Sequence, residues 1–323
     1  MEKVDVLLAT YNGEQYLQEQ IESILNQTYT DFRLLISDDG SKDKTIDIVE
    51  EYAKKDDRII IFKQNENMGV VKNFEFLMKQ VQSKYFMFSD QDDIWKKDKI
   101  EKSVKKIEEG FGLVYSDLEV VDNNLEVMYK SYWKLKGFDR KIRKYNDFDS
   151  LYLNNYITGC TLISRKEYID KVLPIPKSTS FILHDYWLPL IVSKEAKLGY
   201  IDEPLIRYRQ HKNNKIGSQK KSDSMKSLDE IRELFLQVKI EHFTAFVQNE
   251  DKFDERYKEL NKKSLEYFEH LKNVNNFNFR NWTLFFKLYK YENFSYMIQN
   301  FAILNLPMFA RGLFKLKGKV NGK

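Results

Sequence analysis

The first 125 residues alternate between short apolar runs and amphipathic segments, and this alternation constrains the fold more than any other feature. The apolar runs predict strands, and apolar residues three or four positions apart between them predict helices. The predicted strands are Val4–Thr10, Phe32–Ser37, Arg58–Lys63, Tyr85–Ser89 and Leu113–Ser116. The predicted helices are Glu14–Gln27, Asp43–Lys54, Gly69–Val81 and Lys97–Glu109. Strands separated by helices of this length predict βαβ units and a mostly parallel sheet in an α/β fold.

The pattern changes twice further along the chain, which predicts the domain organisation. Residues 126–215 are less regular, and Lys212–Ser227 is polar and lysine-rich, as linkers are. From Leu228 onward the pattern is helical and charged, and then rich in aromatic residues. We therefore expect a catalytic domain over 1–215, divided into halves 1–125 and 126–215, and a helical C-terminal region over 216–323.

Charge and cysteine content narrow the functional classes. The chain has 53 Lys and Arg against 49 Asp and Glu, and the resulting net charge of +4 does not indicate a nucleic-acid partner. Its lysine-rich stretches alternate with acids, as solvated helix faces do. A single cysteine, Cys160, excludes an internal disulfide and fits a reducing compartment. Since we find neither a signal-peptide pattern nor an apolar run of about 18 residues, we expect a cytoplasmic protein without a transmembrane helix.

Acidic residues follow two of the predicted strands. Asp38 and Asp39 come directly after the second strand, and the sequence Asp90-Gln91-Asp92-Asp93 follows the fourth. In open α/β sheets, ligands bind beyond the carboxyl ends of the strands. The sequence therefore predicts a ligand site formed by these two acidic loops.

Each acidic loop has a functional and a purely structural interpretation. The carboxylates of Asp90, Asp92 and Asp93 repel one another, so a folded site needs a cation or many hydrogen bonds there, and Mg²⁺ or Mn²⁺ binds carboxylate and phosphate oxygens together. The alternative is a solvated acidic turn that caps the next helix. A carboxylate at Asp39 suits the imide N–H of uracil or thymine, or a ribose hydroxyl. The alternative is a turn with Gly40 and Ser41.

Two further positions carry ionisable side chains beside aromatic residues. Asp185 precedes Tyr186 and Trp187, and partial desolvation there suits a general base; the alternative is a helix cap with Trp187 in the core. His211 ends a basic segment and is a candidate metal ligand or phosphate contact, or else an ordinary surface histidine.

Four motifs, in order, resemble family 2 glycosyltransferases of the GT-A fold. They are Thr10-Tyr11-Asn12-Gly13, Ser37-Asp38-Asp39-Gly40-Ser41, Asn67-Met68-Gly69-Val70 with Asn73-Phe74, and Ser89-Asp90-Gln91-Asp92-Asp93-Ile94-Trp95. The last is most similar to the form found in bacterial rhamnosyltransferases. The resemblance runs from about residue 3 to residue 211, and the motifs are specific as a set.

The resemblance implies a role for each matching residue. Asp185 matches the catalytic base, in a motif that more often reads Glu-Asp, which leaves the role of His184 open. Asp92 and His211 match ligands of the divalent cation, Mg²⁺ or Mn²⁺. The positions implied for the nucleotide-sugar donor are Thr10, Tyr11, Asn12, Asp38, Asp39, Asn73, Asp90 and Gln91. Those implied for the acceptor are Trp95, His184 and Trp187.

The implied reaction is an inverting transfer from a nucleotide diphosphate sugar to a glycan or lipid-linked oligosaccharide in cell-surface polysaccharide synthesis. The motif around Gln91 and Trp95 favours dTDP-rhamnose, and a UDP-hexose remains open. A non-catalytic nucleotide-binding module is the alternative from another class. A nicotinamide-dependent oxidoreductase is disfavoured because no Gly-x-Gly-x-x-Gly motif follows the first strand.

Aromatic and basic residues alternate over 277–317, with Glu292 as the exception to an absence of acids. Such a segment suits the surface of an anionic bilayer, so we expect peripheral contact with the inner face of the membrane. The alternative is that the aromatic stripe packs against its own domain. An oligomer contact, such as a homodimer, is also open.

Overall fold

The computed structural model describes residues 2–144, 146–177, 181–211, 227–273 and 282–290, with single positions at 297, 301 and 304. The chain divides into two compact units. Unit 1 comprises Met1–Ile175 and Leu183–Ser218, and unit 2 comprises Pro176–Ile182 and Gln219–Lys323. The predicted linker lies outside the described residues apart from Ser227, and the predicted domain boundary at residue 215 stays a prediction.

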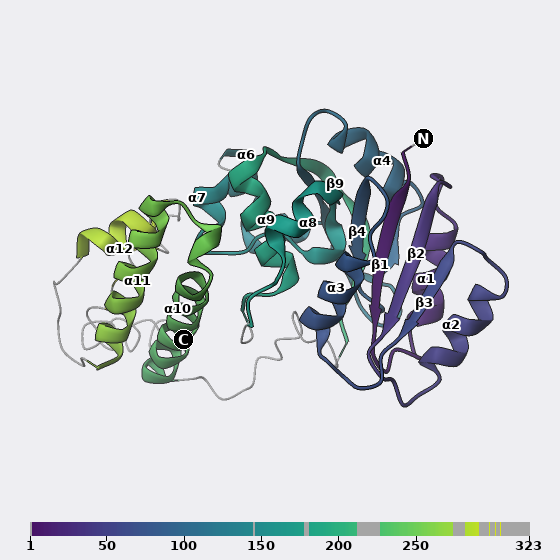
Figure 1. Ribbon diagram of the computed structural model, residues 1–323, viewed down its shortest axis with the longest axis horizontal. Helices are drawn as coiled ribbons and strands as arrows, with labels where there is room; N and C mark the ends of the chain where they lie inside the picture. The colour runs from purple at the N-terminus through teal and green to yellow at the C-terminus, as the bar shows by residue number, and fades with distance from the viewer. Residues whose placement is uncertain are drawn as a thin grey trace, which may run out of the picture. The chain divides into compact units, whose positions relative to one another are not determined.

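Unit 1 contains a nine-stranded sheet, which Figure 1 shows with its helices. Its strands are β1 (Val4–Thr10), β2 (Phe32–Asp38), β3 (Ile59–Lys63), β4 (Tyr85–Ser89), β5 (Ile94–Trp95), β6 (Leu113–Val121), β7 (Val127–Tyr129), β8 (Leu162–Arg165) and β9 (Leu198–Arg209). The order is β3-β2-β1-β4-β8-β6-β9-β5, and β7 pairs with β6. Strands β3, β2, β1 and β4 are parallel, whereas β8 is antiparallel to β4 and β6. The predicted α/β fold with a mostly parallel sheet is therefore present.

The first four helices of unit 1 follow the predicted pattern with shorter ends, and the later ones lie in the part of the sequence where no helix was predicted. The helices are α1 (Leu17–Leu25), α2 (Thr45–Ala53), α3 (Val70–Lys79), α4 (Lys99–Ile107), α5 (Tyr132–Lys136), α6 (Asp139–Lys144), α7 (Phe148–Leu151), α8 (Ile169–Val172) and α9 (His184–Glu195), with 3₁₀ turns at Gly159–Thr161 and Lys166–Tyr168. Strand β6 is five residues longer than predicted because it pairs with β9 along its length and with β7 near its end.

The sheet is covered on both faces. On one face, α1 and α4 contribute Ile21, Ile24 and Ile100 to a core shared with Val6 and Leu8 of β1. On the other face, Phe74 of α3 packs on Phe88 of β4 with ring centroids 4.9 Å apart. Strands buried on both faces are apolar throughout, which explains the unbroken apolar runs in the sequence.

Register brings the two acidic loops to one edge of the sheet. Thr10 of β1 pairs with Asp38 of β2, and Leu8 of β1 pairs with Ser89 of β4. The chain after β1, β2 and β4 therefore leaves the sheet at the same edge, as the sequence predicted.

Unit 2 is helical, with α10 (Leu228–Gln248), α11 (Glu255–Asn273) and α12 (Trp282–Leu288), and a 3₁₀ turn at Glu250–Lys252. Ser227 and Glu230 form a capping box at the start of α10. Helices α10 and α11 pack together through the stacked rings of Phe243 and Phe268, 5.6 Å apart. None of the described helices is long and apolar enough to cross a bilayer.

The predicted membrane-contacting segment, 277–317, lies largely outside the described residues. Where it is described, Phe285 and Tyr289 are buried, and their rings stack at 4.3 Å. These two aromatic side chains thus pack inside unit 2, which is the alternative that the sequence left open for the aromatic stripe.

Candidate active site

A cavity of about 440 Å³ lies at the edge of the sheet where the two acidic loops meet. This volume is within the range of small-molecule sites. Eleven residues predicted for the site line it: Thr10, Tyr11, Asn12, Asp39, Asn73, Asp90, Gln91, Asp92, His184, Asp185 and His211. They come from the ends of β1, β2 and β4, from α3, from the start of α9 and from the residues after β9. The fold thus brings together most of the residues that the motifs singled out.

The loop after β1 is fixed to the loop after β2 by side chains. The Asn12 backbone N–H donates to Ser41 Oγ at 2.8 Å, and the Lys42 N–H donates to Asn12 Oδ1 at 2.8 Å. Gly13 N–H donates to Thr45 Oγ1 at 2.8 Å. These bonds hold Asn12 at a φ of 48°, in the left-handed region that Asn tolerates. They leave Tyr11 43% exposed in the cavity wall, where its ring is accessible from the cavity.

The two acids of the β2 loop are both buried and both engaged. Asp39 accepts the backbone N–H groups of Met68 at 2.8 Å and Gly69 at 2.9 Å, and it also lines the cavity. Asp38 accepts the Ser41 N–H at 2.9 Å and the Thr10 hydroxyl at 3.1 Å. Unlike Asp39, Asp38 does not line the cavity. Its hydrogen bonds therefore stabilise the turn, and the carboxylate does not reach a nucleotide-sugar bound in the cavity.

Asn73 presents an unused acceptor at the cavity. Its side-chain amide donates to the Ser37 carbonyl at 2.9 Å, while its Oδ1 is buried without a hydrogen-bond partner among the described residues. Buried polar atoms are normally hydrogen-bonded. Because Asn73 lines the cavity, a ligand hydroxyl or N–H is a natural partner for this oxygen.

Gln91 joins the acidic loop after β4 to the loop after β1. Its Oε1 accepts the Tyr11 N–H at 2.8 Å, and its Nε2 donates to the Tyr11 carbonyl at 3.1 Å. A Cβ on Gly13 would lie 2.4 Å from Gln91 Oε1, so glycine is required for this close approach. Gln91 lines the cavity as predicted, but both ends of its amide bind the protein backbone.

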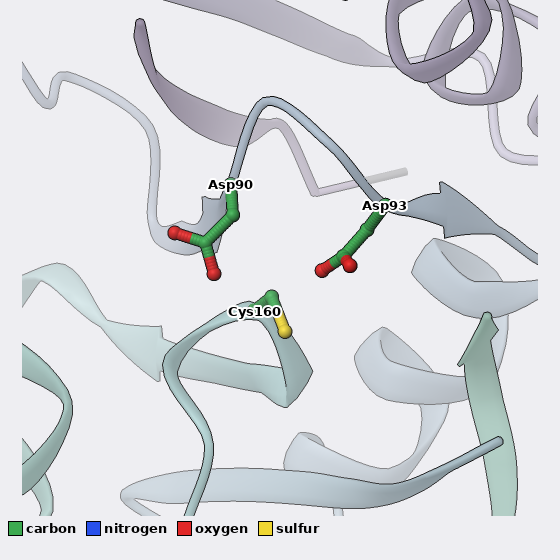
Figure 2. Close-up of side chains that lie close together, drawn as sticks. All are labelled: Asp90, Asp93 and Cys160. Carbon is green, nitrogen blue, oxygen red and sulfur yellow. The ribbon is translucent and has the colours of Figure 1, made fainter. Parts of the chain in front are cut away.

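Two acids of the loop after β4, Asp90 and Asp93, lie close to the thiol of Cys160, and Figure 2 shows them on either side of it. Burial and the charges of Asp92 and Asp185 raise the pKa of Asp90 to about 7. Burial and the neighbouring acids also raise the pKa of Asp93 well above its usual value, and burial raises that of the Cys160 thiol. Asp90 lines the cavity, whereas Asp93 has no exposed surface and lies behind the wall.

Asp92 and His211 meet at the cavity from distant parts of the chain. Asp92 Oδ2 lies 2.8 Å from His211 Nε2. Arg209, which is buried, fixes the loop by donating to the Asp92 carbonyl at 3.0 Å and through its backbone N–H to Asp93 Oδ1 at 3.2 Å. The His211 ring also packs on Tyr16 with centroids 4.8 Å apart.

Three side chains of the cavity wall carry ligand atoms for a divalent cation, while the ligand atoms that lie within 4.8 Å of one another among the described residues are those of Asp90, Asp93 and Cys160. Asp92 and Asp90 offer carboxylate oxygens and His211 an imidazole nitrogen at the cavity wall, a donor set that suits Mn²⁺ and Mg²⁺. Burial, and then repulsion from Asp92 and Asp185, raise the pKa of Asp90, and a bound cation would offset both effects. The tighter group of Asp90, Asp93 and Cys160 suits such an ion less well, because it includes a thiol and Asp93 is sealed from the cavity.

Asp185 lies at the first turn of α9. Burial raises the pKa of its carboxyl to about 7, and backbone N–H groups of the helix start and Gly159 oppose that rise. A Cβ on Gly159 would lie 3.0 Å from Asp185 Cβ and 3.0 Å from His184 Nε2, so glycine permits the 158–160 segment to approach the helix start. A carboxylate with this pKa in a cavity wall is suited to accept a proton near neutral pH.

The three residues predicted for the acceptor differ in placement. His184 lines the cavity, packed on Phe74 at 4.0 Å between centroids, and burial lowers its pKa to about 3, which keeps the ring neutral. Trp187 is fully buried and donates its indole N–H to the Val172 carbonyl at 2.9 Å. A ring without exposed surface contacts no acceptor, so this expectation is corrected in favour of the core interpretation.

Trp95 requires the same correction. It is 3% exposed and does not line the cavity. Instead its ring lies beneath the ammonium of Lys99, with Nζ 3.7 Å from the centroid. Burial lowers the pKa of Lys99 to about 7, while Cys160 and Asp93 oppose this shift. The aromatic end of the motif therefore supports the acidic loop from behind.

Sequence reasoning assigned no site role to several residues that line the cavity. These are Tyr16, Asn67, Gly69, Thr158, Gly159 and Tyr208, of which Asn67 and Gly69 belong to one of the quoted motifs. Arg209 was noticed only as part of a basic segment, although it holds the Asp92 loop. Its position two residues before the candidate metal ligand His211 was the sequence signal that could have identified Arg209 as part of the site.

Comparison with known proteins places these features in a family. Residues 5–173 match the family model "Glycosyl transferase family 2". The chain is 34% identical over 222 residues to the dTDP-rhamnosyl transferase RfbG of Shigella flexneri, covering 65% of this chain and 74% of that protein. It is 25% identical over 201 residues to the UDP-Glc:alpha-D-GlcNAc-diphosphoundecaprenol beta-1,3-glucosyltransferase WfgD of Escherichia coli, covering 62% and 73%.

Solved structures share the fold at lower identity. Staphylococcus aureus TarS 1–349 in complex with UDP-GlcNAc has a TM-score of 0.56 at 19% identity, covering 83% of this chain and 71% of that one. The mannosyltransferase PcManGT of Pyrobaculum calidifontis, in complex with GDP-Man and Mn²⁺, has a TM-score of 0.54 at 14% identity, covering 99% and 80%. With the predicted GT-A fold and the acidic motif in place, the chain belongs to glycosyltransferase family 2.

Proposed function

We propose that this chain is a metal-dependent, inverting glycosyltransferase that transfers rhamnose from dTDP-rhamnose to a glycan or lipid-linked acceptor in cell-surface polysaccharide synthesis. The observation that carries the proposal is the single cavity wall shared by Tyr11, Asp39, Asp92, His211 and Asp185. A surface for a nucleobase, a cation site and a general base are the three components that such a transfer needs.

The donor assignment rests on similarity. The Shigella flexneri relative is named as a dTDP-rhamnosyl transferase, and this supports dTDP-rhamnose. The Escherichia coli relative is named for UDP-Glc, which keeps a UDP-hexose as the alternative. Asp39 retains lone pairs beyond the two N–H bonds it accepts, so it can still receive the imide N–H that thymine and uracil share.

Asp92 and His211 would hold the cation, with Asp90 beside them. Mg²⁺ or Mn²⁺ bound there would neutralise the leaving diphosphate. The presence of Mn²⁺ with GDP-Man in PcManGT supports this assignment.

The chain's own residues account for the proton transfer. Asp185 accepts the proton of the acceptor hydroxyl, and that oxygen attacks the anomeric carbon from the face opposite the diphosphate. A single displacement inverts the configuration and needs no second carboxylate as a nucleophile. The neutral ring of His184, held against Phe74, shields the Asp185 side from water.

A non-catalytic nucleotide-binding module is the second candidate. Such a module would use Tyr11 and Asp39 but would give Asp185 no role. A buried carboxylate with a raised pKa in a cleft usually has a function, which argues against the module. The deciding experiment incubates the chain with a panel of nucleotide sugars, Mn²⁺ or Mg²⁺ and candidate acceptors. We expect turnover with dTDP-rhamnose that chelator abolishes. Binding of nucleotide without turnover of any donor would favour the module.

We place the enzyme in the cytoplasm at the inner face of the membrane, where a lipid-linked acceptor would be reached. Peripheral membrane contact and a homodimer remain proposals.

A further inference from the structure

Large apolar side chains that remain exposed are concentrated in one short segment of unit 1. Among the described residues they are Tyr11, Met68, Val127, Met128, Tyr129, Leu135, Phe181 and Leu234. Four of these eight fall within 127–135, on β7 and α5. Single exposed apolar residues are ordinary, but such a concentration marks an interaction surface.

The same segment is basic and free of acids. Lys130, Lys134 and Lys136 are exposed, and no Asp or Glu occurs from 127 to 138. Over the whole chain the two signs nearly balance, at 53 basic and 49 acidic residues. None of the three lysines forms an ion pair with a described carboxylate. We call the exposed side chains of 127–136 the β7–α5 surface.

Buried contacts hold this surface in place. Asp117 on β6 accepts the hydroxyl of Ser131 and, at 3.1 Å, the backbone N–H of Trp133. The Trp133 side chain is buried, and β7 pairs with β6 through Tyr129 and Val120. The exposed apolar side chains therefore project from an anchored segment and have no place in the core.

The β7–α5 surface adjoins the candidate active site. In the turn before β7, Asn123 accepts the Tyr16 hydroxyl at 3.1 Å, and its carbonyl accepts the Arg209 guanidinium at 2.9 Å. Tyr16 lines the cavity, and Arg209 holds the Asp92 loop. On the α5 side, burial and then the nearby Asp185 carboxylate raise the pKa of Tyr132.

We propose that the β7–α5 surface docks on an anionic lipid bilayer, with Met128, Tyr129 and Leu135 in the interface and the lysines among the phosphate head groups. A bilayer offers apolar depth and negative charge together, which is the combination this surface presents. The inference rests on the proposed peripheral location of the transferase and assigns the face that makes the contact. It would bring the cavity to the place where a lipid-linked acceptor lies.

The test is co-sedimentation of the full chain with vesicles of phosphatidylcholine alone or mixed with phosphatidylglycerol. We expect binding to the anionic vesicles that weakens with salt. The double variant Met128→Glu/Leu135→Glu should bind at least about tenfold more weakly. Lysine-to-glutamine changes at 130, 134 and 136 should cost roughly fivefold each.

Leu234→Glu is the matched control, because Leu234 is 45% exposed on α10 and Leu135 is 43% exposed on α5. It should leave vesicle binding unchanged. Circular dichroism and nucleotide binding check that each variant is folded. Equal anionic-vesicle binding by wild type and the double variant would overturn the proposal, as would a salt-independent dimer that the double variant abolishes, which would assign the surface to a second copy. Vesicle binding needs no turnover, so its failure is distinct from failure of the proposed transferase activity.

Discussion

The loop after β2 and the loop after β4 both carry adjacent acids at the end of a buried parallel strand, yet the structure treats them in opposite ways. In the β2 loop, Asp38 and Asp39 each accept hydrogen bonds from nearby N–H or hydroxyl groups. In the β4 loop, the pKa values of Asp90 and Asp93 are raised by burial and by neighbouring acids. Hydrogen-bond donors therefore surround both carboxylates of the β2 loop. In the β4 loop, hydrogen bonds do not offset the burial and mutual repulsion of the carboxylates.

The difference separates acids that hold a loop through hydrogen bonds from acids that a cation would stabilise, and Asp39 of the first pair also lines the cavity. A carboxylate that accepts several hydrogen bonds is stabilised as an anion, and its removal leaves unsatisfied donors. Carboxylates that are buried close together with few donors cost stability, and a bound cation relieves that cost. The β2 loop should therefore respond to mutation chiefly in folding stability, and the β4 loop chiefly in metal binding and turnover.

The largest effect is expected for Asp92→Ala. Loss of the cation removes several kcal/mol of charge stabilisation, so turnover should fall by about a thousandfold. Stability without metal should change little, because the loss of one repelling carboxylate is offset by the loss of its contact with His211. Turnover assays with and without chelator, together with urea unfolding, measure both. Near-normal turnover of this variant, or of wild type in excess chelator, would remove the β4 loop from the chemistry.

Asp185→Asn should come next, lowering turnover by about a hundredfold while nucleotide binding is retained, because the amide cannot accept the proton. In the wild type, the pKa of Asp185 is raised to about 7, so its base form is lost as the pH falls through that value. Turnover should therefore rise with pH up to about 7 and then level off. If the variant keeps the same pH profile and rate, the base lies elsewhere.

Asp39→Ala should destabilise the fold by about 2 kcal/mol, because the backbone N–H groups of Met68 and Gly69 lose their shared acceptor. Asp38→Ala is the matched variant, since it removes the acceptor of Ser41 and Thr10 without altering a residue of the cavity wall. Urea unfolding should show a loss of stability in both variants. Nucleotide titration should show weaker binding for Asp39→Ala than for Asp38→Ala. Equal nucleotide affinity would make Asp39 as purely structural as Asp38.

The smallest effect is expected for Gln91→Ala. It removes two hydrogen bonds to the Tyr11 backbone, each worth about 0.5–1.5 kcal/mol, so the donor KM should rise up to about tenfold with little change in kcat. Gln91→Glu keeps the acceptor for the Tyr11 N–H and loses only the donor, so it should fall between wild type and Gln91→Ala. A loss confined to kcat would instead indicate that Gln91 acts on the reacting groups.

Much of the architecture was readable from the sequence because strand and helix periodicity is local. The strands Val4–Thr10 and Tyr85–Ser89 occur with the bounds that the pattern predicted, and the four helices of the first 125 residues lie inside their predicted ranges. The placement of Asp39, Asp92 and Asp185 around one site followed from topology and from motif resemblance. These features depend on the order of residues along the chain.

What each side chain does was decided only by the tertiary structure, because burial depends on which distant segments pack above a residue. Trp95 and Trp187 stand beside motif acids in the sequence, but Lys99 covers one ring and Val172 accepts from the other. Asp38 and Asp39 are adjacent, yet only Asp39 reaches the cavity, since successive residues leave a strand end in different directions. The apolar residues of β7 and α5 lie in the less regular part of the sequence, which predicts nothing about their exposure, and only the tertiary structure shows that they face solvent.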